Sequence, residues 1–100
     1  MYRWSVIKSF ADQTTGDIYH GASPKRVLKI DKRLWTVVRR KLDMLNAAIS
    51  LNDLRGPGNH LEKLEDDWTG YWSIRVNDQY RVGFRFDDGN AMDVLCQDIH

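Results

Sequence analysis

The chain has 100 residues, of which 42% are hydrophobic and 29% are charged, and its formal net charge is +1. These values are typical of a soluble globular protein with a single domain over residues 1–100, and they exclude a disordered chain. Because the sequence has no apolar run of about 18 residues and no secretory signal at its start, we expect a cytoplasmic protein without membrane contact. The single cysteine, Cys96, excludes an internal disulfide.

The charges are distributed unevenly along the chain. Residues 1–50 carry ten Lys or Arg and four Asp or Glu, whereas residues 51–100 carry five and ten. Two surfaces of opposite sign would suit one anionic and one basic partner. If the two halves interleave on folding, the field cancels instead.

The first half of the chain predicts one strand and two helical segments. Weak alternation over residues 4–10 favours a strand, and the polar residues 11–21 leave room for one helical turn. A long helix is expected over residues 23–48, because Ser23 is a good N-cap and Pro24 suits the first helical position. Apolar residues at three- and four-residue steps then predict a buried stripe formed by Val27, Ile30, Leu34, Val38, Leu42 and Leu45.

The remaining sides of this predicted helix are rich in cations, opposed only by Asp31 and Asp43. A solvated surface accounts for such a pattern, and so does a contact surface for RNA or an acidic protein. The cationic positions are Lys25, Arg26, Lys29, Lys32, Arg33, Arg39, Arg40 and Lys41.

The last third of the chain predicts antiparallel strands. After a loop at residues 55–59, alternation over residues 71–76 and 80–86 indicates two amphipathic strands. A second hairpin turns at residues 88–89 into a final strand over residues 92–96, whose alternation is poorer. The register that keeps the apolar side chains of the first hairpin on one face pairs Val76 with Tyr80, Ile74 with Val82, and Trp72 with Phe84.

This register sets arginines against each other on the polar face of the hairpin. Arg75 lies opposite Arg81, and Arg85 lies on the same face two positions further along. Facing like charges cost stability unless acids such as Asp93 neutralise them or the cluster holds an anion such as phosphate. Tyr71 shares this face, and an aromatic ring beside basic groups suits a stacked base and its phosphate.

Several polar residues outside the hairpin are further candidates. His100 ends the chain close to Asp98, and neighbouring negative charge raises an imidazole pKa, which suits a general acid, although terminal residues also fray. His20 and His60 fall in loops without metal-ligand spacing, so no metal site is expected. Trp68 stands in an acidic loop, where it either packs in the fold or stacks on a base.

Four motifs stand in one order along the second half of the chain. They are L-E-K-L at 61–64, G-Y-W-S-I-R-V-N-D-Q-Y-R at 70–81, F-R-F and D-G-N-A within 84–91, and D-I-H at 98–100. In these motifs the sequence resembles the HigB-type toxins of bacterial toxin–antitoxin modules, within the RelE/ParE superfamily.

The resemblance implies an α+β, RelE-like (microbial ribonuclease-like) fold, with an N-terminal strand and helices followed by an antiparallel sheet of about four strands. It also implies a ribosome-dependent endoribonuclease that cuts mRNA by attack of a 2′-OH on the adjacent phosphate, without a metal or another cofactor. The expected partners are a helix-turn-helix HigA-type antitoxin, the ribosome with its rRNA, and mRNA. Operator DNA would be contacted only through the antitoxin.

The family's functional positions carry over by residue. Arg81 matches the central arginine that would steady the phosphate charge, and Asp98 and His100 match the pair for proton transfer and positioning. Together with the hairpin argument and the basic residues near the first motif, the expected RNA-binding residues are Arg75, Arg85, Lys63, Tyr71 and His60.

Two positions depart from the family pattern. Relatives have a basic stretch before the strand at 71–76 and a tyrosine between the terminal Asp and His, whereas this chain has Glu62, the acidic residues 65–67, and Ile99. Acidic groups beside an RNA site repel the substrate. Two alternatives therefore stay open: a ParE-like toxin that inhibits DNA gyrase, and a non-catalytic relative that binds an antitoxin.

Overall fold

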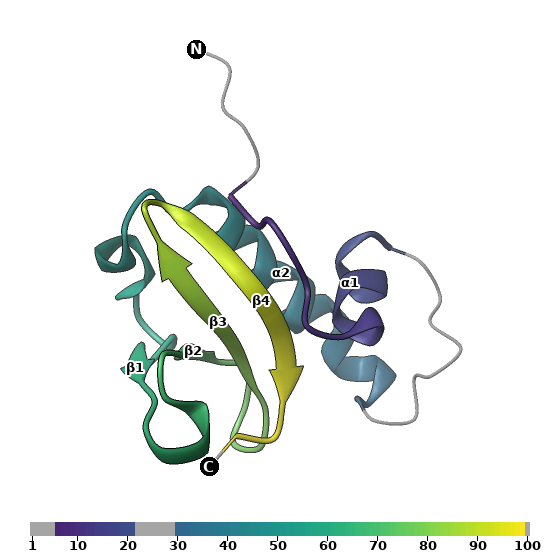
Figure 1. Ribbon diagram of the computed structural model, residues 1–100. Coiled ribbons are helices and arrows are strands. Elements are labelled where there is room, and N and C mark those ends of the chain that lie inside the picture. Colours follow the sequence, from purple (N-terminus) through teal and green to yellow (C-terminus); the bar gives the residue numbers. More distant parts are fainter. Residues whose placement is uncertain (1–5, 22–29, 100) are drawn as a thin grey trace.

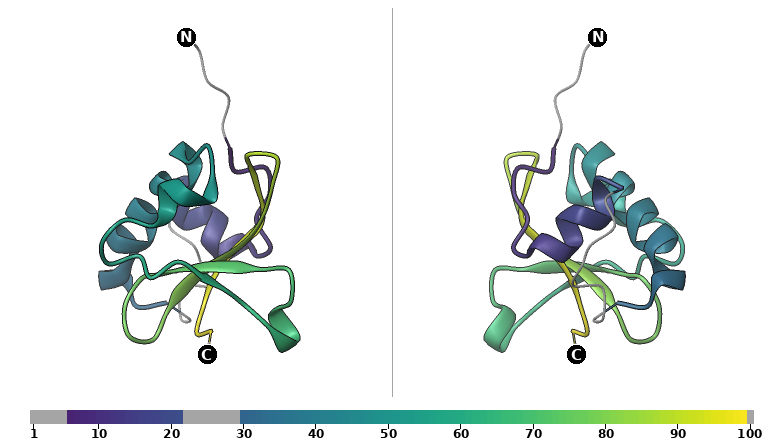
Figure 2. Two further views of the ribbon diagram at one scale, coloured as in Figure 1. Left: turned by 90° about the vertical axis from the view of Figure 1, so that its left-hand side faces the viewer. Right: turned by 90° about the vertical axis from the view of Figure 1, so that its right-hand side faces the viewer.

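The computed structural model describes residues 6–21 and 30–99. In chain order its elements are α1 (Gln13–Tyr19), the 3-10 turn η2 (Lys32–Leu34), α2 (Trp35–Ala47), η3 (Leu51–Leu54), β1 (Glu62–Lys63), η4 (Asp66–Trp68), β2 (Trp72–Arg75), β3 (Arg81–Asp87) and β4 (Asn90–Gln97). The strands form one antiparallel sheet in the order β1-β2-β3-β4 (Figure 1). Both helices lie on the same side of this sheet, and the turn of η4 projects away from them (Figure 2). The predicted α+β class is confirmed.

The N-terminal segment runs beside β4 without forming a full strand (Figure 1). Its described residues make two isolated parallel bridges, Ile7 to Ala91 and Phe10 to Val94. Between them the Asp93 amide donates to the Ser9 hydroxyl at 2.9 Å, so a side chain replaces the backbone acceptor there. The predicted strand over 4–10 is therefore reduced to these bridges, and its first two residues lie outside the described part.

Helix α1 is longer than the single turn expected for residues 11–21. It spans seven residues. Asp12 caps it, because its side chain accepts a hydrogen bond of 2.7 Å from the Thr15 amide. Sequence periodicity missed this helix because its buried side, formed by Thr15, Gly16 and Ile18, is mostly not apolar.

The long predicted helix over 23–48 ends as expected but does not run unbroken from Ser23. Ser23 and Pro24 lie outside the described residues, and Ile30 and Asp31 are not helical. Asp31 has an extended ψ of 129°, and its side chain accepts a 2.9 Å hydrogen bond from the Arg33 amide. This second cap starts η2, which leads directly into α2.

The core lies between the helices and one face of the sheet. The predicted stripe is confirmed at Ile30, which is buried, and at Val38, Leu42 and Leu45, which have no exposed surface. Leu34 is only partly buried, and Val27 lies outside the described residues. Opposite them, the helix-facing side chains of the sheet are fully buried at Ile74, Val82, Phe84 and Val94. Among the described residues, neither α-helix has the length and apolar character needed to span a bilayer.

Lys41 is a correction to the predicted cationic surface of the helix. Its side chain is buried rather than solvated, and only 9% of the residue is exposed. The Nζ atom donates a hydrogen bond of 2.5 Å to Oδ1 of Asn59, in the loop that follows η3. The position lies beside the core stripe, and this hydrogen bond to a residue 18 positions away offsets the cost of burying the amine.

The predicted hairpin register is confirmed. Trp72 pairs with Phe84, Ile74 pairs with Val82, and the Val76 amide donates to the Tyr80 carbonyl at 2.9 Å. As a result, Arg75 and Arg81 lie directly opposite each other, on the face of the sheet that the helices do not cover.

The β3–β4 pairing contains a bulge that changes which side chains reach that open face. The register shifts between Gly83 and Arg85, and Asp93 adopts a positive φ of 52°. Beyond this point Leu95 lies opposite Gly83 on the open face, where Ile99 also packs. The bulge explains why Leu95 breaks the alternation of the last strand.

Candidate functional site

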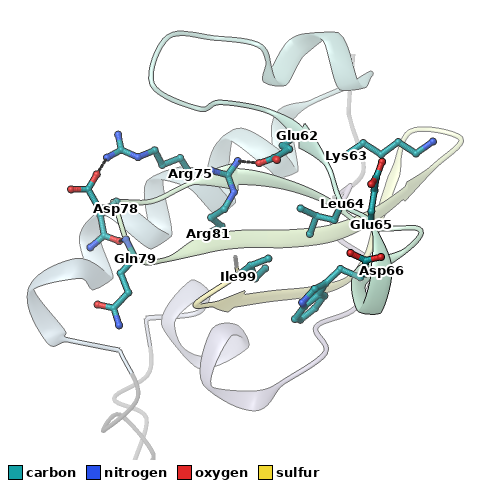
Figure 3. A pocket seen from close by; sticks show the side chains of 12 residues that line it. Glu62, Lys63, Leu64, Glu65, Asp66, Arg75, Asp78, Gln79, Arg81 and Ile99 are labelled. Carbon is teal, nitrogen blue, oxygen red and sulfur yellow. Dashed lines mark hydrogen bonds and ion pairs between the residues drawn. The ribbon is translucent and has the colours of Figure 1, made fainter.

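A cleft on the open face of the sheet is the candidate site. Its volume is about 610 Å³, and it lies between the turn after β2 and the segment that joins β1 to η4 (Figure 3). Arg81 and Ile99 lie in its centre, and the acidic residues Glu65 and Asp66 of the β1–η4 segment line one end. The lining residues are Glu62, Lys63, Leu64, Glu65, Asp66, Trp68, Arg75, Asn77, Asp78, Gln79, Arg81 and Ile99.

Arg81 is held in a fixed position at the floor of the cleft. Only 15% of its side chain is exposed. Nε donates a 2.6 Å hydrogen bond to the Ser73 hydroxyl, and Nη2 donates to the His60 carbonyl. Burial lowers the pKa of Arg81, Glu62 opposes this effect, and Arg75 adds to it. A guanidinium remains protonated at neutral pH in spite of such a shift.

The third nitrogen of this guanidinium is open to the cleft. The hydrogen bonds of Arg81 to described residues use only Nε and Nη2. Within the described part of the chain, no buried polar side-chain atom lacks a partner, so Nη1 is in contact with solvent. The arrangement leaves a pre-oriented, charged donor for an anion.

Glu62 stands beside this donor, and the sequence analysis did not assign it a role. Its Oε2 lies 3.8 Å from Nη2 of Arg81, and 62% of its side chain is exposed. The pairing of Glu62 with Ser73 in β1 and β2 sets this position. The cleft therefore presents a carboxylate acceptor and a guanidinium donor next to each other (Figure 3).

The other two arginines of the hairpin are paired with acids, which is one of the two arrangements expected for this cluster. Arg75 makes an ion pair with Asp78 at the edge of the cleft. Arg85 lies 3.5 Å from Asp93, and its guanidinium sits 4.7 Å from the centre of the Tyr71 ring. Arg85 and Tyr71 do not line the cleft.

Lys63, His60 and Trp68, which the sequence also singled out, differ in how they contribute to the cleft. Lys63 lines the cleft, but its ammonium group points away from Arg81 (Figure 3). His60 contributes its backbone carbonyl to Arg81 and does not line the cleft with its ring. Trp68 packs edge-to-face on Tyr71, with ring centres 5.3 Å apart, and also lines the cleft.

Asp98 opens onto a different hollow. This hollow has a volume of about 400 Å³ and is lined by Asp12, Thr14, Ile30, Gln79, Tyr80, Cys96, Gln97 and Asp98. Gln79 lines both spaces, and its Nε2 lies 3.4 Å from Oδ2 of Asp98. The structure therefore does not bring Asp98 into the cleft of Arg81, and His100 lies outside the described residues.

The metal-binding side chains of the described residues do not gather into a metal centre. Across residues 6–21 and 30–99, no three His, Cys, Asp or Glu side chains are arranged to hold a metal ion. The charged groups of the cleft are two guanidinium groups, several carboxylates and an ammonium group.

Comparison with known proteins identifies the family. The family described as RelE-like toxin of type II toxin-antitoxin system HigB matches residues 3–100. The chain belongs to the HigB-like toxin family. The resemblance seen in the sequence motifs is confirmed.

Individual relatives of this HigB-like toxin agree with that assignment. Toxin HigB-1 of Vibrio cholerae is 45% identical over 69 residues, which cover 68% of this chain and 73% of the relative. Endoribonuclease HigB of Proteus vulgaris is 30% identical over 63 residues, which cover 63% of this chain and 68% of the relative. The protein is thus a RelE-family toxin of a toxin–antitoxin system and a homologue of an endoribonuclease.

Solved structures confirm the RelE-like fold of the HigB-like toxin. The YoeB-YefM complex from Staphylococcus aureus contains a chain with a TM-score of 0.59 and 19% identity, matched over 98% of this chain and 100% of that chain. The YoeB dimer from the same organism gives a TM-score of 0.55 at 22% identity, over 96% and 99% of the two chains.

Proposed function

We propose that this HigB-like toxin is a metal-independent endoribonuclease that cuts mRNA on the ribosome. The observation that supports this function best is the pairing, in one cleft, of the oriented Arg81 guanidinium with the Glu62 carboxylate 3.8 Å away. A fixed guanidinium stabilises charge that develops on a phosphate, and an adjacent carboxylate accepts a proton from a hydroxyl. Phosphoryl transfer within RNA needs both functions at one phosphate.

The proposed reaction is an internal transesterification. Glu62 takes the proton of the 2′-OH, and the 2′ oxygen attacks the neighbouring phosphorus while Nη1 of Arg81 binds a phosphate oxygen. The bond between phosphorus and the 5′ oxygen then breaks, which gives a 2′,3′-cyclic phosphate and a 5′-OH. His100, assigned by family resemblance, donates the proton to the leaving 5′ oxygen.

The charges of the cleft support dependence on the ribosome. Among the residues that the structure describes, four carboxylates line it, from Glu62, Glu65, Asp66 and Asp78, and three cations line it, from Lys63, Arg75 and Arg81. Such a lining attracts free RNA weakly. A ribosome that presents mRNA in a fixed position supplies the binding energy that the cleft lacks.

The other expected residues have supporting roles in this proposal. Arg75 and Lys63 contact the RNA backbone once a phosphate competes with their acidic neighbours, and Arg85 with Tyr71 contacts the chain beyond the cleft. His60 acts through its carbonyl on Arg81. Asp98 acts on the terminal residue rather than on the phosphate. A HigA-type helix-turn-helix antitoxin is the proposed partner that restrains the toxin.

Induction of the chain in growing bacteria, followed by mapping of mRNA ends, tests this function. We expect growth arrest and new 5′-OH ends within translated regions, with 2′,3′-cyclic phosphate on the upstream fragments. Arg81→Ala and His100→Ala should each abolish the new ends. Cleavage with 5′-phosphate ends would overturn the transesterification, and growth arrest without new ends would favour inhibition of gyrase. Harmless expression would favour a non-catalytic relative.

A further inference from the structure

A buried lysine connects helix α2 to the loop that holds Arg81. Lys41 and Asn59 are only 9% and 3% exposed, and Nζ of Lys41 lies 2.5 Å from Oδ1 of Asn59. Burial lowers the pKa of Lys41, and the nearby charges of Arg40 and Arg75 lower it further. A buried amine contributes less to stability than an apolar side chain of the same size, because the apolar side chain has no charge to desolvate.

Hydrogen bonds hold both the side chain and the backbone of Asn59. Its Nδ2 donates to the Leu54 carbonyl at 3.2 Å, and its amide donates to the Gly56 carbonyl at 3.2 Å. Its own carbonyl accepts a bond of 2.6 Å from the Arg75 amide at the end of β2. The loop after η3 is therefore attached to both the helix and the sheet at this one residue.

The next residue contacts the candidate catalytic group directly. His60 has a positive φ of 45°, a backbone conformation that residues other than glycine seldom adopt. Its carbonyl accepts a hydrogen bond from Nη2 of Arg81. The strained backbone points this carbonyl at the guanidinium. Neighbouring structure must hold such a residue in place, and the adjacent Asn59 supplies that hold.

We propose that Lys41 and Asn59 are positioning residues for Arg81: the buried Lys41–Asn59 bond fixes the loop so that the His60 carbonyl orients the guanidinium at the floor of the cleft. This inference rests on the proposed function, because it takes Arg81 as the group that binds the scissile phosphate. Neither residue touches the RNA. Their removal changes the geometry of the phosphate-binding donor, so its main effect falls on the chemical step.

Four variants of the full chain test the proposal. Lys41→Met removes the amine but keeps a long apolar stem, and Asn59→Leu removes the acceptor with little change in volume. Asn59→Asp keeps an oxygen for Lys41 and gives up the Nδ2 bond to the Leu54 carbonyl, so it separates the Lys41 contact from the rest of the Asn59 network. Arg40→Met is the matched control, since it removes an exposed cation from the adjacent position of the same helix.

Three measurements are made on each variant: mRNA cleavage on programmed ribosomes, the NMR signal of the Arg81 Nε–H group, and Tm. For Lys41→Met and Asn59→Leu we expect kcat to fall about tenfold or more with KM nearly unchanged, and the Arg81 signal to shift or broaden. Asn59→Asp should retain kcat within about threefold of the parent protein, and Arg40→Met should match the parent in kcat and in the Arg81 signal.

The proposal is overturned if Lys41→Met and Asn59→Leu keep the parent kcat and the parent Arg81 signal. It is also overturned if kcat and Tm fall together in Lys41→Met and Asn59→Leu, and Asn59→Asp retains neither the parent kcat nor the parent Tm. Failure of the proposed function gives a different result: Arg81→Ala would still cleave, while the Arg81 signal would still respond to Lys41→Met. If one of the two disruptive variants does not fold, the Arg81 signal in the other decides.

Discussion

The Arg81 Nε and the Ser73 Oγ lie 2.6 Å apart, across the neighbouring strands β3 and β2. Ser73 is fully buried, so its hydroxyl is the acceptor that holds one edge of the guanidinium away from water. The pair aims the opposite edge of Arg81 into the cleft. This relationship makes Ser73 a sensitive position for both stability and activity.

Ser73→Ala should lower the free energy of unfolding by about 1–2 kcal/mol, because it leaves a buried N–H group without an acceptor. We expect cleavage on ribosomes to fall about tenfold, since the guanidinium loses its alignment. Urea denaturation and cleavage assays measure the two effects. Ser9→Ala is the control, because it removes a hydroxyl that accepts from the Asp93 backbone amide and not from Arg81. Equal losses of activity in both variants would contradict the specific role of Ser73.

Glu62→Gln should reduce the rate of mRNA cleavage about 100-fold or more, because the amide cannot accept the proton of the 2′-OH. The change keeps the size of the side chain, so the fold should be preserved. Glu65→Gln removes a carboxylate from the same cleft and is expected to leave the rate nearly unchanged. An increased rate in Glu62→Gln would show that Glu62 only competes with the phosphate for Arg81.

Gly83→Ala should destabilise the protein by about 1–3 kcal/mol through overpacking. A Cβ at this position would lie 3.1 Å from Cδ1 of Ile99 and 3.4 Å from Cδ1 of Leu95. The double variant Gly83→Ala/Ile99→Val removes the closer of these methyl groups and should recover part of the loss. Chemical denaturation of the single and double variants checks this, and a double variant less stable than either single change would contradict the packing argument.

Cys96 should be unreactive toward thiol reagents in the folded protein at pH 8. Burial, with a smaller contribution from Asp12, raises the pKa of Cys96 to about 12, compared with an ordinary value near 9.0. Above pH 9 the unfolded chain loses the thiol proton while the folded chain keeps it, so this residue makes stability fall as pH rises from about 9 to about 12. The slope contributed by the thiol approaches about 1.4 kcal/mol per pH unit.

Denaturation at several alkaline pH values, compared with Cys96→Val, isolates this contribution. The valine variant should show a shallower loss of stability above pH 9. Rapid labelling of native Cys96 at pH 8, or identical slopes for both proteins, would contradict the predicted burial of the thiol.

The sheet could be predicted from sequence because its information is local. Alternation in two segments joined by a short turn leaves one register that buries Ile74 and Val82 together, and the opposition of Arg75 and Arg81 follows from it. The helix start was harder to predict. Ser23 and Pro24 are a strong signal for a helix start, but Asp31, eight residues later, also acts as an N-cap. Residue spacing alone does not show which of the two positions begins the helix.

The contacts that build the site could not be predicted in the same way, because they join distant parts of the chain. Glu62 reaches Arg81 only because a two-residue strand with no apolar pattern pairs with β2. Lys41 looked solvated by its helical position, and its burial depends on Asn59 in a loop. Acids and amides in loops give no periodic signal, so their positions are known only when the chain is folded.

The bulge at Asp93 determines the sidedness of the C-terminal end of the chain. One extra residue in β4 reverses the odd–even assignment of every later side chain. As a result Leu95 lies on the open face and Ile99 lines the cleft, while Asp98 opens onto the other hollow. If β4 kept all its residues but paired regularly, Val94 would lie opposite Gly83 in place of Leu95, and Asp98 and Ile99 would exchange sides. A carboxylate would then replace an aliphatic side chain next to Arg81, so the bulge alone separates two different versions of the same floor.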